Sequence, residues 1–339
     1  MSASEQAGQL LMVGLDVNAR RSSLDDLVRD RHLGGVVLLG GWFGGAEPVR
    51  STTKHLNSLV DGSGAPRLLL AADQEGGNVQ QLRGEGFTRI PTGRAQAALG
   101  TDVLTRRAAS WATELRAVGI NVNLAPVADT VPADVGRDND PIGQWDRQYA
   151  SDPDAVSRAV GAFIDGMHRG GVAATIKHFP GIGRITGNTD LTADGITDRT
   201  TTATDPYLRP FESGIADGAD LVMVGSAIYS RIEPGVHATF SKRIVTDLLR
   251  TRLGYDGVVI TDDVGAAKAV SGTPVGARAT RFVDAGGDIV LTARPDTAPT
   301  MHRALTRRMA DSGAFAAKVR QSATRVLQLK VERGLASCT

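Results

Sequence analysis

The chain contains 339 residues, of which 41% are hydrophobic and 22% charged, and its 38 Lys and Arg nearly balance its 37 Asp and Glu. A net charge of +1 provides no basic field for a phosphate backbone, so we expect no nucleic-acid partner. The longest apolar runs, such as GGVVLLGG at 34–41, are much shorter than the roughly 20 residues that a membrane-spanning helix needs, so we expect no membrane span.

Eight short runs rich in Val, Ile and Leu recur along the chain, and their continuous apolarity indicates buried parallel strands. In chain order they cover 10–15, 34–40, 67–73, 120–129, 172–179, 220–228, 257–263 and 288–293. Amphipathic stretches of helical length lie between them. Asp152 and Pro153 predict the N-cap and first residue of a helix over 152–169, Ser241 caps another over 241–253, and the last helix is expected from about 298 to 333.

Eight strand and helix pairs without a break in composition predict one domain over 1–339, a single (β/α)8 TIM-type barrel. A doubly wound open sheet is the alternative architecture. Two connections, 128–152 and 180–205, are too long for plain turns. Both leave the C-terminal ends of strands, where barrel enzymes place their chemistry.

Polar residues gather at these predicted strand ends. They are Asp73, Glu75, Asp129, Lys177, His178, Ser226, Asp262, Asp263 and Thr292. Any single Asp could cap the next helix, but several at one face suit a sugar, whose hydroxyls all need hydrogen-bond partners. Only His178 of the six histidines lies there, so the sequence predicts no metal site and no cofactor. The segment GIGRITG at 181–187 matches no phosphate-binding motif and is expected to form a flexible loop.

Six motifs occur in the order and spacing of one known family. They are GQLLMVG (8–14), DQEGGNVQQL (73–82), NVNLAPVAD (121–129), IKHFPGIG (176–183), ATFS (238–241) and GVVITDD (257–263). Together they resemble the N-terminal barrel of glycoside hydrolase family 3, and most of all its single-domain β-N-acetylglucosaminidase branch. The resemblance covers nearly the whole chain.

The resemblance implies a retaining β-glycosidase that acts on a small carbohydrate, a β-glycoside or an aminosugar. In that mechanism Asp262 matches the nucleophile that attacks the anomeric carbon. Asp263 is expected to point away and to act as a structural cap, because neighbouring strand residues face opposite sides. The matching substrate-binding residues are Asp73, Arg147, Lys177 and His178, although a buried salt bridge is the alternative explanation for Lys177 and His178.

Two departures from the family pattern affect function. The family's D-x-EGGRVxR has arginines where this chain carries Asn78 and Gln81, so a cationic contact to the substrate is lost. The family loop reads KHFPGHG and then an Asp-x-His dyad, whereas this chain has Ile182, Asn188 and Asp190 in place of the first His, the dyad Asp and the dyad His. The family's acid/base therefore cannot operate unchanged.

Three hypotheses about function follow from this loop. In the first, Asp190 is the acid/base of an active exo-acting β-N-acetylhexosaminidase-like hydrolase, since retaining glycosidases normally use a carboxylic acid. Asp194 and Asp198 are alternatives for this role, although we expect them to be solvated loop carboxylates. In the second, the protein is a non-catalytic sugar-binding pseudo-glycosidase. The third, a glycoside phosphorylase, is disfavoured because an ionised Asp190 would repel phosphate.

The ends of the chain provide little further information. The start, MSASEQAGQLLMVG, lacks the features of a signal peptide, which predicts a cytoplasmic protein as written, or an extracellular or cell-envelope protein if this is the mature part of a secreted precursor. The single cysteine, Cys338, excludes an intrachain disulfide and a thiolate metal cluster.

Overall fold

The computed structural model describes residues 1–337, so Cys338 lies outside the described residues. Its main sheet has eight parallel strands, one in each predicted run, although β1 extends one residue beyond the end of its run. They are β1 (Leu11–Asp16), β2 (Gly35–Leu39), β3 (Leu69–Ala72), β6 (Val122–Asn123), β7 (Ala173–Phe179), β9 (Leu221–Val224), β11 (Val258–Thr261) and β12 (Val290–Thr292). From β1 to β11 each strand pairs with the next in chain order, and β12 pairs with β1. A parallel bridge between Ile260 and Ile289 closes the ring, which confirms the predicted (β/α)8 barrel.

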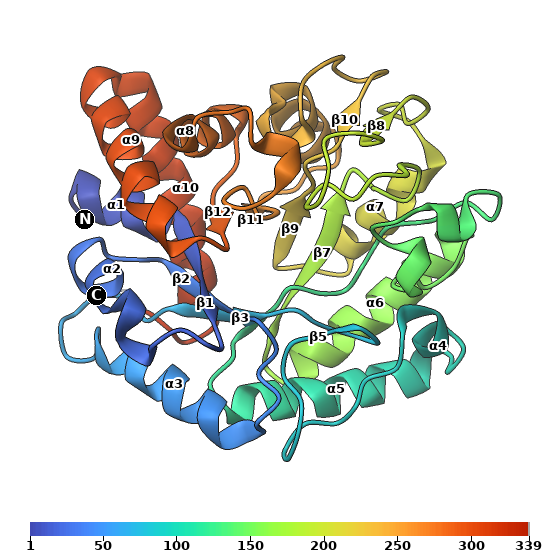
Figure 1. Ribbon diagram of the computed structural model, residues 1–339, viewed down its shortest axis with the longest axis horizontal. Helices are drawn as coiled ribbons and strands as arrows, with labels where there is room; N and C mark the ends of the chain where they lie inside the picture. The colour runs from blue at the N-terminus through green and yellow to red at the C-terminus, as the bar shows by residue number, and fades with distance from the viewer. Residues whose placement is uncertain (338–339) are drawn as a thin grey trace.

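Helices cover the outside of this barrel (Figure 1). The α-helices are α1 (Ala3–Gln9), α2 (Asp25–Asp30), α3 (Ala46–Ser58), α4 (Gly93–Ala97), α5 (Thr101–Ala117), α6 (Pro153–Arg169), α7 (Arg209–Ala216), α8 (Val275–Ala285), α9 (Ala298–Asp311) and α10 (Gly313–Glu332). A π-helix, η6 (Arg243–Arg252), lies between β9 and β11. Short 3₁₀ turns are η1 (Arg21–Leu24), η2 (Gly136–Asp138), η3 (Gly143–Trp145), η4 (Pro206–Leu208), η5 (Ala238–Phe240), η7 (Lys268–Val270) and η8 (Pro295–Thr297). Among residues 1–337, no helix has the length and apolarity needed to cross a bilayer.

Alternation along the strands divides the apolar core into two parts. In β2, Val36 and Leu38 pack outward against the helices, whereas Val37 faces the barrel interior, because successive strand residues point to opposite faces. The interior cluster includes Met12, Leu69 and residues from the other strands. The barrel is therefore a packed core, and polar chemistry is restricted to its ends.

The predicted helix starts are confirmed by their caps. The Asp152 carboxylate accepts a hydrogen bond from the Ala155 amide at 2.9 Å, and Pro153 is the first residue of α6. The Ser241 hydroxyl oxygen accepts one from the Ile244 amide at 3.1 Å at the start of η6.

The prediction of one last helix over 298–333 is wrong, because the segment forms two helices, α9 and α10. Ser312 between them is extended, with φ −146° and ψ 109°, and its hydroxyl oxygen accepts a hydrogen bond from the Phe315 amide. A Ser that caps a new helix, followed by Gly313, is the local signal for this break.

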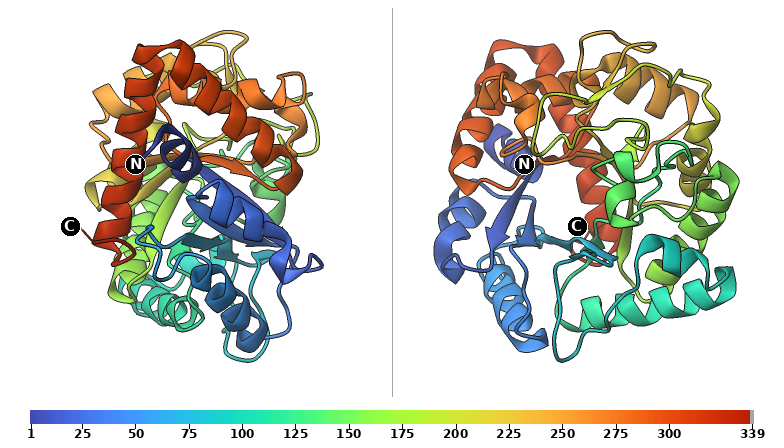
Figure 2. Two further views of the ribbon diagram at one scale, coloured as in Figure 1. Left: turned by 90° about the vertical axis from the view of Figure 1, so that its left-hand side faces the viewer. Right: turned by 45° about the vertical axis from the view of Figure 1, so that its right-hand side comes forward.

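Helix α10 covers the N-terminal end of the barrel. Its Val326 and Leu329 belong to the interior cluster, and the ammonium group of the buried Lys330 donates a hydrogen bond to Gln9 of α1 at 2.6 Å. Figure 2 shows α1 and α10, the blue and red ends of the colour scale, side by side. Since this end is filled, the opposite, C-terminal end is the open one.

Candidate active site

A cavity of about 300 Å³ lies at the C-terminal ends of the strands. The structure brings all six predicted site residues together in its lining, namely Asp73, Arg147, Lys177, His178, Asp190 and Asp262. Asp73 and Asp262 directly follow β3 and β11, and Lys177 and His178 end β7. No group of three or more His, Cys, Asp or Glu suited to a metal ion occurs within residues 1–337.

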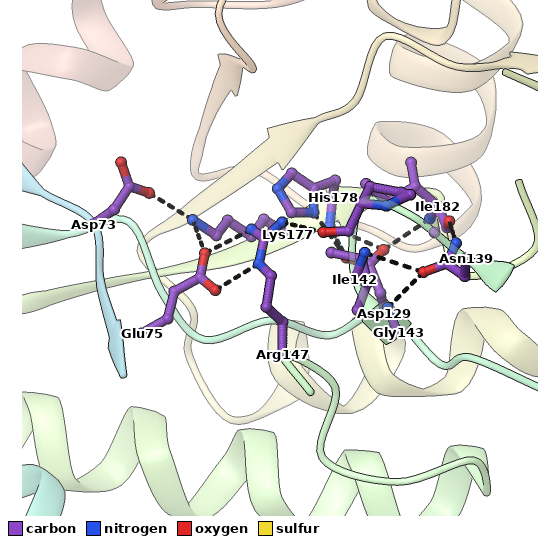
Figure 3. Close-up of polar contacts among 12 residues, drawn as sticks. Asp73, Glu75, Asp129, Asn139, Ile142, Gly143, Arg147, Lys177, His178 and Ile182 are labelled. Atoms are coloured by element: carbon purple, nitrogen blue, oxygen red, sulfur yellow. Dashed lines mark hydrogen bonds and ion pairs between the residues drawn. The ribbon is translucent and has the colours of Figure 1, made fainter. Parts of the chain in front are cut away.

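One wall of the cavity is a buried network of charged side chains (Figure 3). The Lys177 ammonium lies 2.6 Å from both Asp73 and Glu75. The Arg147 guanidinium donates two hydrogen bonds to Glu75, at 2.9 and 2.8 Å, and a third to the carbonyl of Pro141 at 2.6 Å. Lys177 is 2% exposed, so these charges interact with little screening by water.

The network favours the charged forms of Glu75 and Lys177. Burial acts to raise the pKa of Glu75, but the positive charges of Arg147 and Lys177 outweigh it and lower that pKa to about 2. Burial likewise acts to lower the pKa of Lys177, and the carboxylates of Asp73 and Glu75 outweigh it and raise that pKa. The buried salt bridge considered as the alternative for Lys177 thus exists, and it lies in the cavity wall.

Glu75 joins Lys177 to Arg147, whereas the sequence placed it only among the polar strand-end residues, without a specific role. Its side chain is buried, and the short strand that contains it, β4 (Gln74–Gly76), pairs with β5 (Val79–Gln80). The available signal was its position two residues after Asp73 in the DQEGG motif.

A second buried pair holds His178. The fully buried Asp129 carboxylate accepts a hydrogen bond from Nδ1 of His178 at 2.7 Å, and another from the backbone amide of Ile182 at 2.8 Å. Because a carboxylate only accepts, Nδ1 carries the proton and Nε2 is the ring nitrogen that remains for a ligand. His178 therefore enters the cavity with a fixed ring orientation.

The two aspartates after β11 are held differently. Oδ1 of Asp262 accepts a hydrogen bond from the Asp263 amide at 2.8 Å. The Asp263 carboxylate accepts from the backbone amides of Gly265, Ala266 and Ala293 at 2.7, 3.1 and 2.9 Å. Asp263 thus caps the turn as expected, but it also lines the cavity, so the prediction that it points away is wrong. The turn after the strand lets both neighbours reach the same side.

Asp190 lies at the outer edge of the cavity, where its side chain is exposed and a ligand can reach it. Its backbone carbonyl accepts a hydrogen bond from the Lys268 amide at 3.1 Å, which holds this part of the connection against the segment that follows β11. Although solvent reaches the side chain, burial by the surrounding protein, followed by the charges of Asp262 and Asp263, raises the pKa of Asp190 to about 7.

Asp194 and Asp198, the other candidates for the acid/base, lie on the same connection but outside the cavity lining. Asp194 is exposed, as expected for a loop carboxylate. Asp198 is buried in β8 (Thr197–Asp198), which pairs with β10 (Ile228–Tyr229), and its carboxylate accepts hydrogen bonds from the amides of Thr200 and Thr201. The expectation that Asp198 is solvated is therefore wrong, and neither residue lines the cavity.

The positions that depart from the family pattern have other partners. Ile182, which replaces a family His, is 2% exposed and lines the cavity. Gln81, which replaces a family Arg, accepts a hydrogen bond from the Gly41 amide at 3.0 Å and links the segments after β2 and β3. The 181–187 segment, expected to be a flexible loop, is bound through the carbonyls of Ile182 and Ile185 to the Asn139 side chain.

Comparisons with known proteins show the family of this chain. The model of the glycosyl hydrolase family 3 N-terminal domain matches residues 2–329. A beta-hexosaminidase of Stenotrophomonas maltophilia is 35% identical in a 323-residue alignment that covers 90% of this chain and 90% of its own. The crystal structure of a beta-N-acetylhexosaminidase from Beutenbergia cavernae has a TM-score of 0.94 at 42% identity and covers 98% of this chain and 99% of its own. A family 3 beta-N-acetylglucosaminidase from a Paenibacillus species gives a TM-score of 0.86 at 29% identity, over all of this chain and 64% of its own. The chain belongs to glycosyl hydrolase family 3 and is a glycoside hydrolase.

Proposed function

We propose that the protein is an exo-acting, retaining β-N-acetylhexosaminidase in which Asp262 is the nucleophile and Asp190 the general acid/base. The observation that carries this proposal is that Asp190 and Asp262 line the same cavity, and it is supported by the pKa of Asp190, which burial and the charges of Asp262 and Asp263 raise to about 7. A carboxylic acid with this pKa retains its proton near neutral pH, as a general acid must.

The first step breaks the glycosidic bond. A carboxylate oxygen of Asp262 attacks the anomeric carbon while Asp190 transfers its proton to the departing oxygen, which leaves a glycosyl ester on Asp262 and a carboxylate on Asp190. Because the ester is uncharged, it removes one of the charges that raise the pKa of Asp190. The resulting carboxylate then accepts a proton from water as that water attacks the anomeric carbon and releases Asp262.

The cavity wall supplies the groups that bind the sugar. Asp73 accepts hydrogen bonds, Lys177 and Arg147 donate them, and His178 presents Nε2, so the hydroxyls of one ring meet both donors and acceptors. A cavity of about 300 Å³ is at the lower end of the roughly 300 to 1,000 Å³ range of ligand sites. This size suits a single terminal sugar and supports exo action.

The names of the similar proteins support an N-acetylhexosamine as that sugar. Incubation with aryl N-acetyl-β-glucosaminide, β-glucoside and β-xyloside tests this assignment directly. We expect the N-acetylglucosaminide to be hydrolysed with the highest kcat/KM. Preference for the glucoside would overturn the proposed substrate, and no release from any glycoside would favour the non-catalytic hypothesis.

A further inference from the structure

We infer that Asn139 is a positioning residue for the acid: its side-chain amide joins the connection after β6 to the connection after β7 and thereby places Asp190. This inference rests on the proposed function, because it concerns the role assigned there to Asp190. Asn139 does not line the cavity, so any effect it has on catalysis must pass through other residues.

The Asn139 side chain is fully buried and uses all of its hydrogen-bonding capacity (Figure 3). Its Nδ2 donates to the carbonyl of Ile182 at 2.8 Å and to that of Ile185 at 2.7 Å. Its Oδ1 accepts from the amides of Ile142 at 3.1 Å and Gly143 at 2.8 Å. Four partners of matching polarity settle the orientation of the amide group. Nδ2 of Asn139 therefore binds the connection after β7, which carries Asp190, and Oδ1 binds the connection after β6.

The two connections also touch directly beside Asn139. A Cβ atom on Gly183 would lie 2.0 Å from the carbonyl oxygen of Thr130, so the backbones are as close as a glycine allows. The Asp129 carboxylate binds the Ile182 amide at 2.8 Å. The start of the connection that carries Asp190 is therefore bound through both the backbone amide and the backbone carbonyl of Ile182.

Further backbone hydrogen bonds connect Ile182 and Ile185 to the segment that carries Asp190. The amides of Thr186 and Gly187 both donate to the carbonyl of Gly195, at 3.1 and 3.0 Å, which closes the intervening residues into a short turn. Within that turn the Asn188 side chain accepts a hydrogen bond from the Asp190 amide at 3.0 Å. Asp190 thus follows Ile185 by five residues. Hydrogen bonds hold most of the backbone between them.

This arrangement matters because the acid is a short side chain on a long connection. Proton transfer requires the carboxyl group to lie within hydrogen-bond reach of the glycosidic oxygen. A displacement of about 1 Å can cost roughly 100-fold in rate. Release of Ile182 and Ile185 should therefore impair protonation of the leaving group, while the sugar-binding wall around Lys177 remains in place.

The variant Asn139→Asp separates the two halves of the contact. A carboxylate keeps an acceptor for Ile142 and Gly143, but it cannot donate to Ile182 and Ile185, whose carbonyl oxygens it would repel. Asn121→Asp is the matched control. Asn121 also bridges backbone groups, donating to Leu68 at 3.1 Å and accepting from Leu70 at 2.9 Å, but it does so at the N-terminal end of the barrel.

The test compares two N-acetyl-β-glucosaminides, one with a dinitrophenyl leaving group that needs no proton and one with a phenyl leaving group that does. We expect Asn139→Asp to lower kcat/KM for the phenyl substrate at least about tenfold more than for the dinitrophenyl substrate, with KM for the phenyl substrate within about twofold of wild type. Asn121→Asp should leave the ratio of the two rates unchanged. If Asn139→Asp does not fold by circular dichroism, Asn139→Ala, which adds no charge, takes its place with the same expectation.

Equal loss on both substrates, or the same selective loss in Asn121→Asp, would overturn the inference. Asp190→Ala, measured beside these variants, distinguishes failure of the positioning role of Asn139 from failure of the acid assignment of Asp190. If Asp190→Ala loses the phenyl substrate selectively and Asn139→Asp does not, only the positioning role is wrong. If Asp190→Ala shows no selective loss, the acid assignment is wrong and the role of Asn139 falls with it.

Discussion

The two sides of the cavity are built by different means. The sugar-binding wall stands on or next to strand ends, and buried opposite charges hold it, as in the contacts of Lys177 with Asp73 and Glu75. The acid side is a long connection held by backbone hydrogen bonds, and within residues 1–337 the Asp190 carboxyl accepts no hydrogen bond. The difference follows from the chemistry. Groups that bind a sugar keep their charge, whereas an acid/base must change its charge during each turnover and would be locked by a close cation.

The largest effect should come from replacing Asp262, the proposed nucleophile. Asp262→Asn should lower kcat roughly 10⁴-fold or more, because an amide cannot form the glycosyl ester. Circular dichroism and thermal melting should match wild type. Activity close to wild type would remove Asp262 from the mechanism and direct attention to Asp263.

The acid side should respond according to the leaving group. Asp190→Ala should lower kcat/KM, which reports the first step, roughly 10²- to 10⁴-fold for a phenyl glycoside, which is the range that general acid catalysis contributes. The loss of kcat/KM for a dinitrophenyl glycoside should be much smaller, because its first step needs no proton, whereas its kcat should also fall, because Asp190 is the base of the second step. Steady-state rates on both substrates check this, and equal losses of kcat/KM would exclude Asp190 as the acid.

The wall should respond through stability as well as binding. Glu75→Gln removes the charge shared by Lys177 and Arg147, and breaking a buried ion pair costs about 3–5 kcal/mol. Denaturant unfolding measures this cost. Asp165→Asn, which breaks an exposed pair with Arg169 on α6, is the control and should cost less than about 1 kcal/mol. Similar losses in the two variants would contradict the description of the wall as a buried network.

The difference in unfolding free energy between wild type and Glu75→Gln should depend on pH. The pKa of Glu75 is about 2 in the folded protein, against 4.5 as its ordinary value, so its charge stabilises the fold above about 4.5. This contribution is lost as the pH falls toward about 2. The stability difference between wild type and Glu75→Gln should therefore shrink over that range, and a constant difference would contradict the assignment.

The smallest effect concerns the charge next to the acid. The kcat/KM of the wild type should fall as the pH rises above about 7, where Asp190 loses its proton. Asp263→Asn removes one of the charges that raise this pKa, so the alkaline limb should move to lower pH. A limb that stays in place or moves upward would show that Asp263 does not act on Asp190.

The fold could be predicted from local patterns because a barrel repeats one unit. Apolar runs located all eight strands, and the cap at Asp152 located the start of α6. The break at Ser312 was missed because both sides of it have helical periodicity. A cap of one residue interrupts that pattern too briefly to be seen in a sequence window.

The site was predictable only where a motif could be matched. The strand-end residues were found, but the contacts that hold them to one another were not. Glu75 and Arg147 are 72 residues apart, and Asn139 and Ile182 are 43 apart. Such contacts depend on how neighbouring connections fold over the barrel. The burial of Asp198, which binds Thr200 and Thr201 within its own segment, was missed for a different reason: it needs the β8 and β10 pair to cover it.

The role of Asp190 is tested most directly by azide rescue of Asp190→Ala with a dinitrophenyl N-acetyl-β-glucosaminide. The substrate should form the ester on Asp262, and azide, with the carboxylate removed, should enter beside it and attack the anomeric carbon. Our account predicts a faster turnover with azide and a product, identified by NMR, that is the β-glycosyl azide. No acceleration in azide, or an α-glycosyl azide, would contradict it.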